Sequence, residues 1–110
     1  MRLHVKDNGY VNQAALLKKN VEERIQVDYA TDGMIIELCV DKVIKEEESY
    51  SIASVENGWK ITGSDEVGLY YGIGKFLHSA TWTEDSFEPK ATEGVVTPSS
   101  SFRAVYFAVP

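Results

Sequence analysis

The chain has 110 residues, of which 44% are hydrophobic and 25% are charged. Such a composition is typical of one folded domain that buries a core of its own, and it excludes global disorder. The formal net charge of -6 disfavours nucleic acids and anionic membranes as partners, because their phosphates would be repelled at long range. The N-terminal segment lacks the long apolar core of a signal peptide, and no transmembrane run follows it.

The N-terminal quarter of the chain predicts a short strand and an amphipathic helix. An extended segment, Leu3–Val5, precedes the turn signal Asn8-Gly9. Asn12 is then expected to cap a helix from Gln13 to Gln26. The apolar residues of this helix recur at helical spacing and form one stripe, made of Ala14, Leu17, Val21 and Ile25. The stripe predicts that the helix lies on another layer of the protein.

A buried strand is predicted next, at Met34–Val40, after a turn at Thr31–Gly33. The run MIIELCV is short, rich in isoleucine and valine, and almost wholly apolar, which is typical of a strand covered on both faces. Cys39 is the only cysteine of the chain, so no internal disulfide forms. Its apolar neighbours favour a small buried residue over a reactive nucleophile.

Two further strands, Tyr50–Val55 and Trp59–Gly63, flank the hairpin signal Asn57-Gly58. Both turn residues tolerate the positive φ of a type I′ turn. A two-residue loop at this point would pair Glu56 with Trp59 and Ser54 with Ile61. It would also place Trp59 and Ile61 on the same face of the sheet.

The stretch GSDEVGLYYGIGKFLHSATW predicts a second helix, capped by Ser64 or Asp65. Its wide apolar surface comprises Val67, Tyr70, Tyr71, Ile73, Phe76, Leu77 and Ala80. Glycines inside a helix cost stability, so they need a compensating contact. Gly68 and Gly72 share one face and predict a close approach to a sheet or a neighbouring segment. Gly74 lies on another side, where it would serve a second contact or a local bend.

The same stretch does not match the glycine patterns that bind phosphate. In a P-loop the Gly-Lys pair follows the first glycine after four residues and precedes Ser or Thr, whereas Gly74-Lys75 follows Gly68 after five residues and precedes Phe76. The dinucleotide pattern fails as well, because Leu77 stands at the position of its third glycine. We therefore expect a structural helix and no cofactor.

Other chemistry-bearing residues have simpler structural explanations. His4 and His78 lack the spacing of a metal pair, and Glu46–Glu48 is interpreted as a solvated turn rather than a cation site. No Gly-x-Ser-x-Gly elbow singles out a nucleophile. Trp82 is the best candidate for an aromatic side chain that contacts carbohydrate or another domain, because it enters a polar loop. For the remaining aromatic residues, core packing is the better explanation.

The C-terminal part of the chain predicts a long polar loop and a final strand. The loop extends from Thr83 to Ser101, and the strand, Phe102–Val109, has apolar side chains on both alternating sets. A strand of that kind is normally covered on both sides. We therefore expect the natural protein to continue past Pro110 and this chain to be a fragment of it.

Three of these segments together carry a family resemblance. Glu48–Ile52 has the form E-x-Y-x-I, Ile61–Asp65 is a strand that ends in a polar turn, and Gly68–Gly72 has the form of a G-L-x-Y-G helix. In this order they resemble the non-catalytic N-terminal domain that precedes the barrel in α-glucuronidases and β-N-acetylhexosaminidases. The likeness is sharpest from Ile61 to Leu77, and the extra glycine at position 74 departs from it.

The resemblance implies an α+β fold, with a mixed β-sheet and two helices packed on one face. It implies an accessory domain at residues 1–97, followed at 98–110 by a junction and the start of a truncated catalytic barrel. Pro98, Phe102 and Arg103 match the P-x-x-x-F-R segment that begins the first barrel strand, so Arg103 joins Trp82 as a candidate carbohydrate or interface contact. The catalytic acids of such enzymes lie on later barrel strands, so no catalytic residue is expected in this chain.

The expected role is therefore that of an accessory domain, without activity alone, in a glycoside hydrolase that acts outside the cytoplasm. Its expected partners are the catalytic barrel of the same polypeptide and carbohydrate. A stand-alone carbohydrate- or protein-binding module that uses Trp82 is the first alternative. An unrelated small enzyme or regulator is the second, and a compact pocket that gathers perturbed carboxylates or His78 would favour it.

Overall fold

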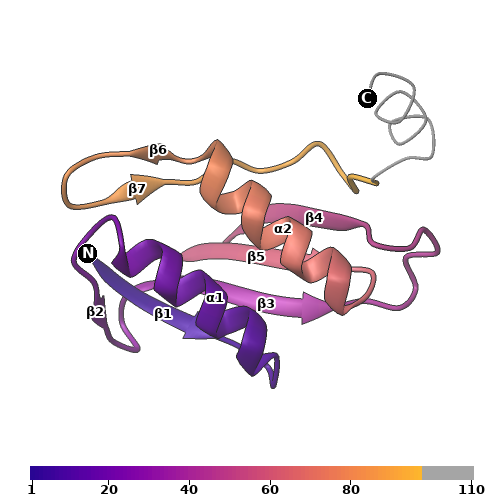
Figure 1. Ribbon diagram of the computed structural model, residues 1–110, viewed down its shortest axis with the longest axis horizontal. Coiled ribbons are helices and arrows are strands. Elements are labelled where there is room, and N and C mark those ends of the chain that lie inside the picture. Colours follow the sequence, from indigo (N-terminus) through magenta and orange to yellow (C-terminus); the bar gives the residue numbers. More distant parts are fainter. Residues whose placement is uncertain (98–110) are drawn as a thin grey trace.

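A computed structural model of the chain describes residues 1–97 as a mixed sheet with two helices on one face (Figure 1). The five strands of this sheet are β1 (Arg2–Lys6), β2 (Asp28–Tyr29), β3 (Met34–Val40), β4 (Tyr50–Val55) and β5 (Gly58–Gly63). The helices are α1 (Val11–Glu22) and α2 (Glu66–Ser79), and a small hairpin follows, made of β6 (Thr81–Trp82) and β7 (Phe87–Glu88). The predicted α+β class is confirmed.

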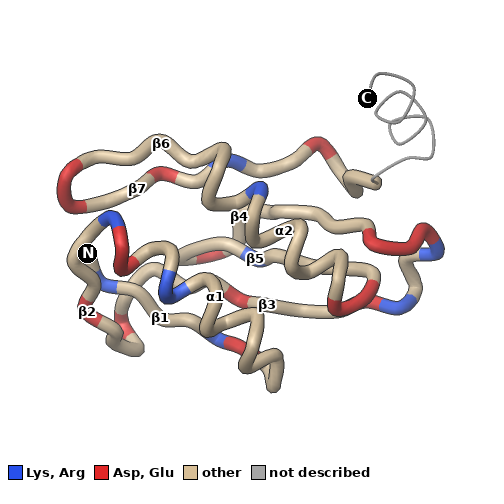
Figure 2. The backbone as a smooth tube through the Cα atoms, in the orientation of Figure 1, with Lys and Arg blue, Asp and Glu red and all other residues tan. Residues whose placement is uncertain are grey.

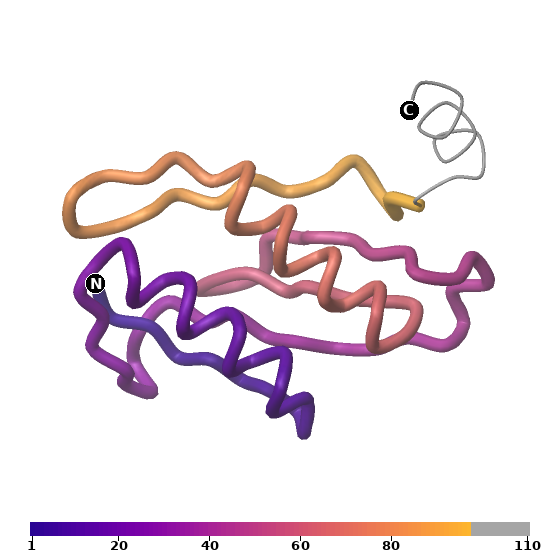
Figure 3. Tube along the Cα trace, in the orientation of Figure 1, coloured from indigo at the N-terminus to yellow at the C-terminus, as the bar shows by residue number. Residues whose placement is uncertain are grey.

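The strand order of the sheet is β2-β1-β3-β5-β4. Neighbouring strands are parallel from β2 to β5, and β4 pairs antiparallel to β5 at the edge. The segment that ends at Thr97 runs beside β4 (Figure 3), where the backbone N–H of Tyr50 donates to the carbonyl of Val96 at 2.9 Å. This segment covers an edge that would otherwise offer unpaired backbone groups to another chain.

The first helix carries most of the predicted apolar stripe into the core, but it ends at Glu22 rather than at Gln26, so Ile25 lies in the turn that follows it. Ala14, Leu17, Val21 and Ile25 are all buried, and they join the side chains of the sheet and of α2 in one hydrophobic cluster. The predicted cap is wrong: α1 begins at Val11, so Asn12 lies in its first turn, and Tyr10 precedes it without a side-chain cap. The chain enters the helix directly from the Asn8-Gly9 turn, where both residues have positive φ.

Within residues 1–97 strand β3 is covered on one face only, whereas the sequence predicts two covered faces. Ile36 and Leu38 are fully buried under the helices, while the intervening side chains, including Cys39, are half-buried. Both described helices lie on the same side of the sheet, so the opposite face stays open within residues 1–97 (Figure 1). That open face carries charged residues on adjacent strands. In the strand registers Lys6 of β1 pairs with Glu37 of β3, and Glu37 pairs with Lys60 of β5.

The hairpin between β4 and β5 forms with a register different from the predicted one. Val55 pairs with Gly58 and Ser54 with Trp59, so the loop consists of Glu56 and Asn57. Asn57 supplies the positive φ of 63° at the turn. Gly58 belongs to the strand instead, because a Cβ atom there would clash with the backbone carbonyl of Ile35 on β3. Trp59 and Ile61 still share the helix-facing side, as predicted.

The second helix confirms the packing role of Gly68 and Gly72, whereas Gly74 makes no such contact among the described residues. A Cβ atom at Gly68 would clash with the carbonyl oxygen of Ser49, and one at Gly72 would lie 2.8 Å from Cγ2 of Ile61. Around Gly74 no atom lies within 4 Å of such a Cβ, so the predicted second contact is missing in the described part. The predicted apolar surface divides into two parts. Its buried residues are Ile73, Phe76 and Leu77, its exposed residues are Val67, Tyr70 and Tyr71, and Ala80, just after the helix, is half-buried.

The predicted polar loop after Thr83 is more ordered than expected. Thr81 and Trp82 pair with Phe87 and Glu88 in a short hairpin, and Phe87 is buried against the core. Burial of one aromatic side chain and the pairing with β4 give this polar segment a fixed course, which its composition did not indicate. The predicted strand Phe102–Val109 and the junction at 98–110 lie outside the described residues.

Candidate functional site

Trp82 lies at the outer end of a chain of aromatic contacts. Its ring stacks on Phe87 with centroids 4.7 Å apart, Phe87 meets Phe76 edge-on at 6.0 Å, and Phe76 meets Trp59 at 6.2 Å. The indole Nε1 donates to the carbonyl of Leu77 at 3.0 Å. The sequence placed Trp82 in a polar loop, whereas the hairpin holds its half-buried side chain against the core.

A guanidinium group lies over the same indole ring. Cζ of Arg24 is 4.6 Å from the ring centroid, which is a cation–π geometry. Arg24 follows the end of α1, so this contact ties the first helix to the hairpin. With Phe87 and Arg24 both on its ring, Trp82 offers only part of its surface to a further ligand.

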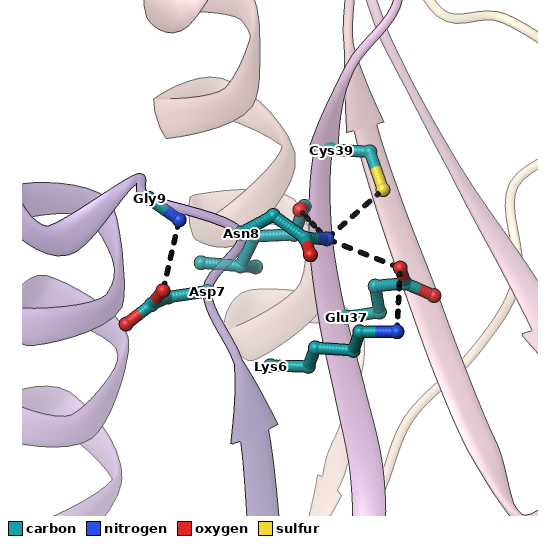
Figure 4. Close-up of polar contacts among 7 residues, drawn as sticks. Lys6, Asp7, Asn8, Gly9, Glu37 and Cys39 are labelled. Atoms are coloured by element: carbon teal, nitrogen blue, oxygen red, sulfur yellow. Dashed lines mark hydrogen bonds and ion pairs between the residues drawn. The ribbon is translucent and has the colours of Figure 1, made fainter.

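The second cluster of polar groups lies on the open face, where β1 ends beside β3 (Figure 4). The side-chain amide of Asn8 donates to the carbonyl of Leu38 at 2.9 Å and to the carboxylate of Glu37 at 3.1 Å. It also lies 3.6 Å from Sγ of Cys39. Asn8 therefore replaces the backbone donor that β1 no longer supplies to β3, and the cluster has a clear structural role.

Electrostatics in this cluster keep the carboxylate charged and the thiol protonated. The hydrogen bond from Asn8, together with the charges of Lys6 and Lys60, lowers the pKa of Glu37. Burial, together with the Glu37 charge, raises the pKa of Cys39. A raised pKa makes the thiol a poor nucleophile at neutral pH, which agrees with the prediction of an unreactive cysteine. Sequence reasoning treated Asn8 as a turn residue only and gave Glu37 no role. The sequence signal that could have singled out Glu37 was its position as a charged residue between the apolar residues of β3.

The N-terminus of α2 is occupied by the protein's own carboxylate. Asp65 accepts hydrogen bonds from the backbone N–H of Gly68 at 2.7 Å and of Glu48 at 3.0 Å. Of the two predicted caps, Ser64 and Asp65, the structure selects Asp65, whose carboxylate engages the Gly68 N–H at the helix N-terminus. The glycine-rich segment is therefore a capped helix, as the failed phosphate motifs indicated.

Two open depressions, of about 500 and 240 Å³, lie at the start of β3 and beside β1, and neither includes Trp82 or His78. No group of three or more His, Cys, Asp or Glu side chains in the described part could hold a metal ion. Neither described helix has the length and hydrophobicity needed to cross a membrane. Arg103, the other candidate contact, lies outside the described residues.

Comparison with known proteins places this fold within larger enzymes. No protein-family model and no curated protein sequence matches the chain. A GH138 enzyme targeting pectin rhamnogalacturonan II matches with a TM-score of 0.56 and 21% identity, over 69% of this chain and 10% of its own. A glycoside hydrolase family 20 β-N-acetylglucosaminidase matches with a TM-score of 0.60 and 24% identity, over 83% of this chain and 16% of its own.

A β-N-acetylhexosaminidase from Bacteroides fragilis NCTC 9343 matches with a TM-score of 0.52 and 14% identity, over 83% of this chain and 19% of its own. The chain thus spans only 10 to 19% of the length of these structures. At such identities the likeness shows the fold alone. The resemblance to a domain of glycoside hydrolases is confirmed at the level of the fold, and the α-glucuronidase part of it stays a prediction.

Proposed function

We propose that this chain is a non-catalytic, N-terminal accessory domain of a larger glycoside hydrolase, where it braces the catalytic barrel or borders its substrate cleft. One observation carries the proposal. Most of the chain matches a small part of much longer glycoside hydrolases, with 69 to 83% of this chain covered and only 10 to 19% of theirs. A fold that recurs as a minor part of such enzymes is expected to serve the part that performs the chemistry.

The polar groups of the described residues support a role without chemistry. Glycoside hydrolysis ordinarily needs two carboxyl groups that flank the scissile bond, one of them available as an acid. Asp65 is engaged by two backbone N–H groups, and Glu37 is held charged by Asn8 and by lysines. Both carboxylates are engaged in hydrogen bonds that hold the fold together.

Activity measurements test this proposal directly. The purified chain should not hydrolyse aryl β-N-acetylglucosaminides, aryl glucuronides or other aryl glycosides, whereas the polypeptide that its natural gene encodes should hydrolyse at least one of them. Turnover by the 110-residue chain itself would overturn the accessory role. Absence of any glycosidase domain from the full gene product would overturn the assignment to a glycoside hydrolase.

Trp82 remains the proposed contact to carbohydrate or to the catalytic barrel, since part of its ring surface is accessible. Titration of the chain with N-acetylglucosamine oligomers would test the carbohydrate contact. Trp82→Phe is the informative variant, because it keeps an aromatic ring against Phe87 while it removes the larger indole. Arg103 is proposed as part of the junction to the barrel, on the basis of the P-x-x-x-F-R motif.

A further inference from the structure

The chain contains two Asn-Gly pairs in closely similar local sequences, and the fold holds them differently. Asn8 lies in the stretch DNGY and Asn57 in the stretch ENGW, so an acidic residue precedes each pair and an aromatic residue follows it. Both asparagines are exposed, and both have a positive φ, of 50° and 63°. Because local sequence, exposure and φ are matched, a difference in reactivity between the two asparagines would report their tertiary contacts.

Asparagine before glycine is chemically labile, because glycine has no Cβ atom to keep its backbone nitrogen away from the side-chain amide. The nitrogen attacks Cγ of the asparagine, the C–N bond of the amide breaks, and ammonia leaves with the proton of the attacking N–H. Water then opens the cyclic imide that has formed. Cleavage at Cγ yields aspartate, and cleavage at the backbone carbonyl carbon yields isoaspartate. Water is the only co-reactant of the sequence.

The contacts of Asn8 oppose this reaction in the folded protein (Figure 4). Its side-chain amide donates to the carbonyl of Leu38 at 2.9 Å and to the carboxylate of Glu37 at 3.1 Å. The N–H of Gly9 donates to Oδ1 of Asp7 at 2.9 Å. The amide would have to leave its acceptors before it could turn toward the Gly9 nitrogen. The charge of Glu37 also disfavours a new carboxylate at position 8.

The side chain of Asn57 has no comparable restraint. It makes no hydrogen bond within residues 1–97, and it lies in the exposed loop of the β4–β5 hairpin. The backbone carbonyl of Asn57 accepts a hydrogen bond from the N–H of Ile35 at 2.9 Å, which holds the backbone and leaves the side-chain amide free to turn. Asn57 also borders the open depression at the start of β3, so water has access to this site.

We propose that Asn57 is a site of spontaneous deamidation in the folded protein, whereas Asn8 is protected by its contacts. The product carboxylate adds a negative charge to the depression that Asp32 also lines. Figure 2 shows acidic residues at many points along the described chain, whose formal net charge is already -6. The depression therefore becomes more anionic as the protein ages. Where isoaspartate forms, the extra backbone atom also displaces the carbonyl that binds Ile35.

Peptide mapping of the purified chain tests the proposal, with the same chain unfolded in urea as the reference. Samples are incubated at mildly alkaline pH with and without urea, digested, and scored by mass spectrometry for conversion of amide to acid. Because the local sequences are matched, Asn8 and Asn57 should react at similar rates in urea. In the folded chain we expect Asn57 to react several-fold faster than Asn8. Equal rates in the folded chain, or faster reaction of Asn8, would overturn the proposal.

A double variant tests whether the contacts of Asn8 cause its protection. Asp7→Ala combined with Glu37→Ala removes both carboxylates that hold the Asn8-Gly9 pair. Relative to the same variant in urea, reaction at Asn8 should rise several-fold, while reaction at Asn57 keeps its wild-type rate and so reports that the fold is intact. An unchanged rate at Asn8 would contradict protection by these contacts. Glycosidase activity has no part in either measurement, so the outcome is independent of the proposed function.

Discussion

Gly68 lies directly against the backbone carbonyl of Ser49, without room between them for a Cβ atom. The contact joins the first turn of α2 to the segment that enters β4. Because Ser49 is fully buried and its N–H is bound by Oγ of Ser64 at 2.9 Å, this segment has little freedom to move away. The tight approach explains why position 68, on the side of α2 that faces the sheet, is a glycine.

Gly68→Ala is therefore expected to lower the free energy of unfolding by about 1–3 kcal/mol, since either the helix or the Ser49 segment must shift. Gly74→Ala is the matched control in the same helix and should raise it by about 0.5–1 kcal/mol, because its Cβ meets no atom. Urea unfolding of the 110-residue chain, followed by circular dichroism, measures both. Equal stability of the two variants would contradict the packing argument.

Gly58→Ala should be strongly destabilising, by about 1–3 kcal/mol or more, because the new Cβ would clash with the backbone of Ile35 in the adjacent parallel strand. Asn57→Gly is the neighbouring control. Asn57 has a φ of 63°, which glycine adopts readily, so this change should be nearly neutral. Thermal unfolding compares the two variants. If Gly58→Ala were as stable as the wild type, the close approach of Gly58 to Ile35 would be contradicted.

Protonation of Glu37 should make the protein less stable at acidic pH. Its pKa is lowered in the folded state, so it stabilises the fold at pH values above its unfolded pKa. That contribution is lost as the pH falls through the folded pKa, when the carboxylate takes up a proton. Glu37→Gln should therefore flatten the dependence of unfolding free energy on pH in this acidic window, measured by urea titrations at several pH values.

Asn8→Gly tests whether the hydrogen bond from Asn8 lowers the pKa of Glu37, because glycine keeps the positive φ of 50° and removes the side-chain amide. Since the hydrogen bond from Asn8 is the largest cause of the lowered pKa, the pKa of Glu37 should rise toward its ordinary value. Lys60→Gln removes a weaker charge effect and should shift it less. NMR titration of the Glu37 carboxyl carbon distinguishes these outcomes, and an unchanged pKa in Asn8→Gly would contradict the assignment.

Trp82→Ala should lower the free energy of unfolding by about 2–3 kcal/mol, because it removes the stack on Phe87 and the hydrogen bond to Leu77. Arg24→Ala removes only the cation–π contact at an exposed position and should lower it by about 0.5–1 kcal/mol. Unfolding by guanidinium chloride, followed by the circular dichroism of the backbone, measures the stability of both variants without relying on tryptophan. If Trp82→Ala is as stable as the wild type, the hairpin is not anchored by this ring.

The local elements of the fold were predictable because their signals lie close together in the sequence. The apolar stripe of α1, the run of β3 and the cap Asp65 are each read from a few consecutive residues, and the structure confirms them. The hairpin register was not predictable. Asn57-Gly58 carries a turn signal, but Gly58 is needed against Ile35, a residue that is distant in sequence.

The candidate sites show the same division. Trp82 was singled out from its polar neighbours, yet its contacts with Phe87 and Arg24 depend on how the hairpin returns to the core and on where α1 ends. Asn8 and Glu37 received no joint role, because they are separated by a helix and a strand and meet only across the β1–β3 ladder.

By itself the sequence determined the class of the fold, the capped helix with its packing glycines, and the likeness to a domain of glycoside hydrolases. Periodicity, turn residues and short motifs are local signals, so they can be recognised without knowing how the elements pack against one another. Only the tertiary structure decided which face of the sheet is covered, which glycine remains uncovered, and which side chains share a surface. Those features arise from pairings between distant segments, whose energies depend on packing and on burial of charge rather than on neighbouring residues.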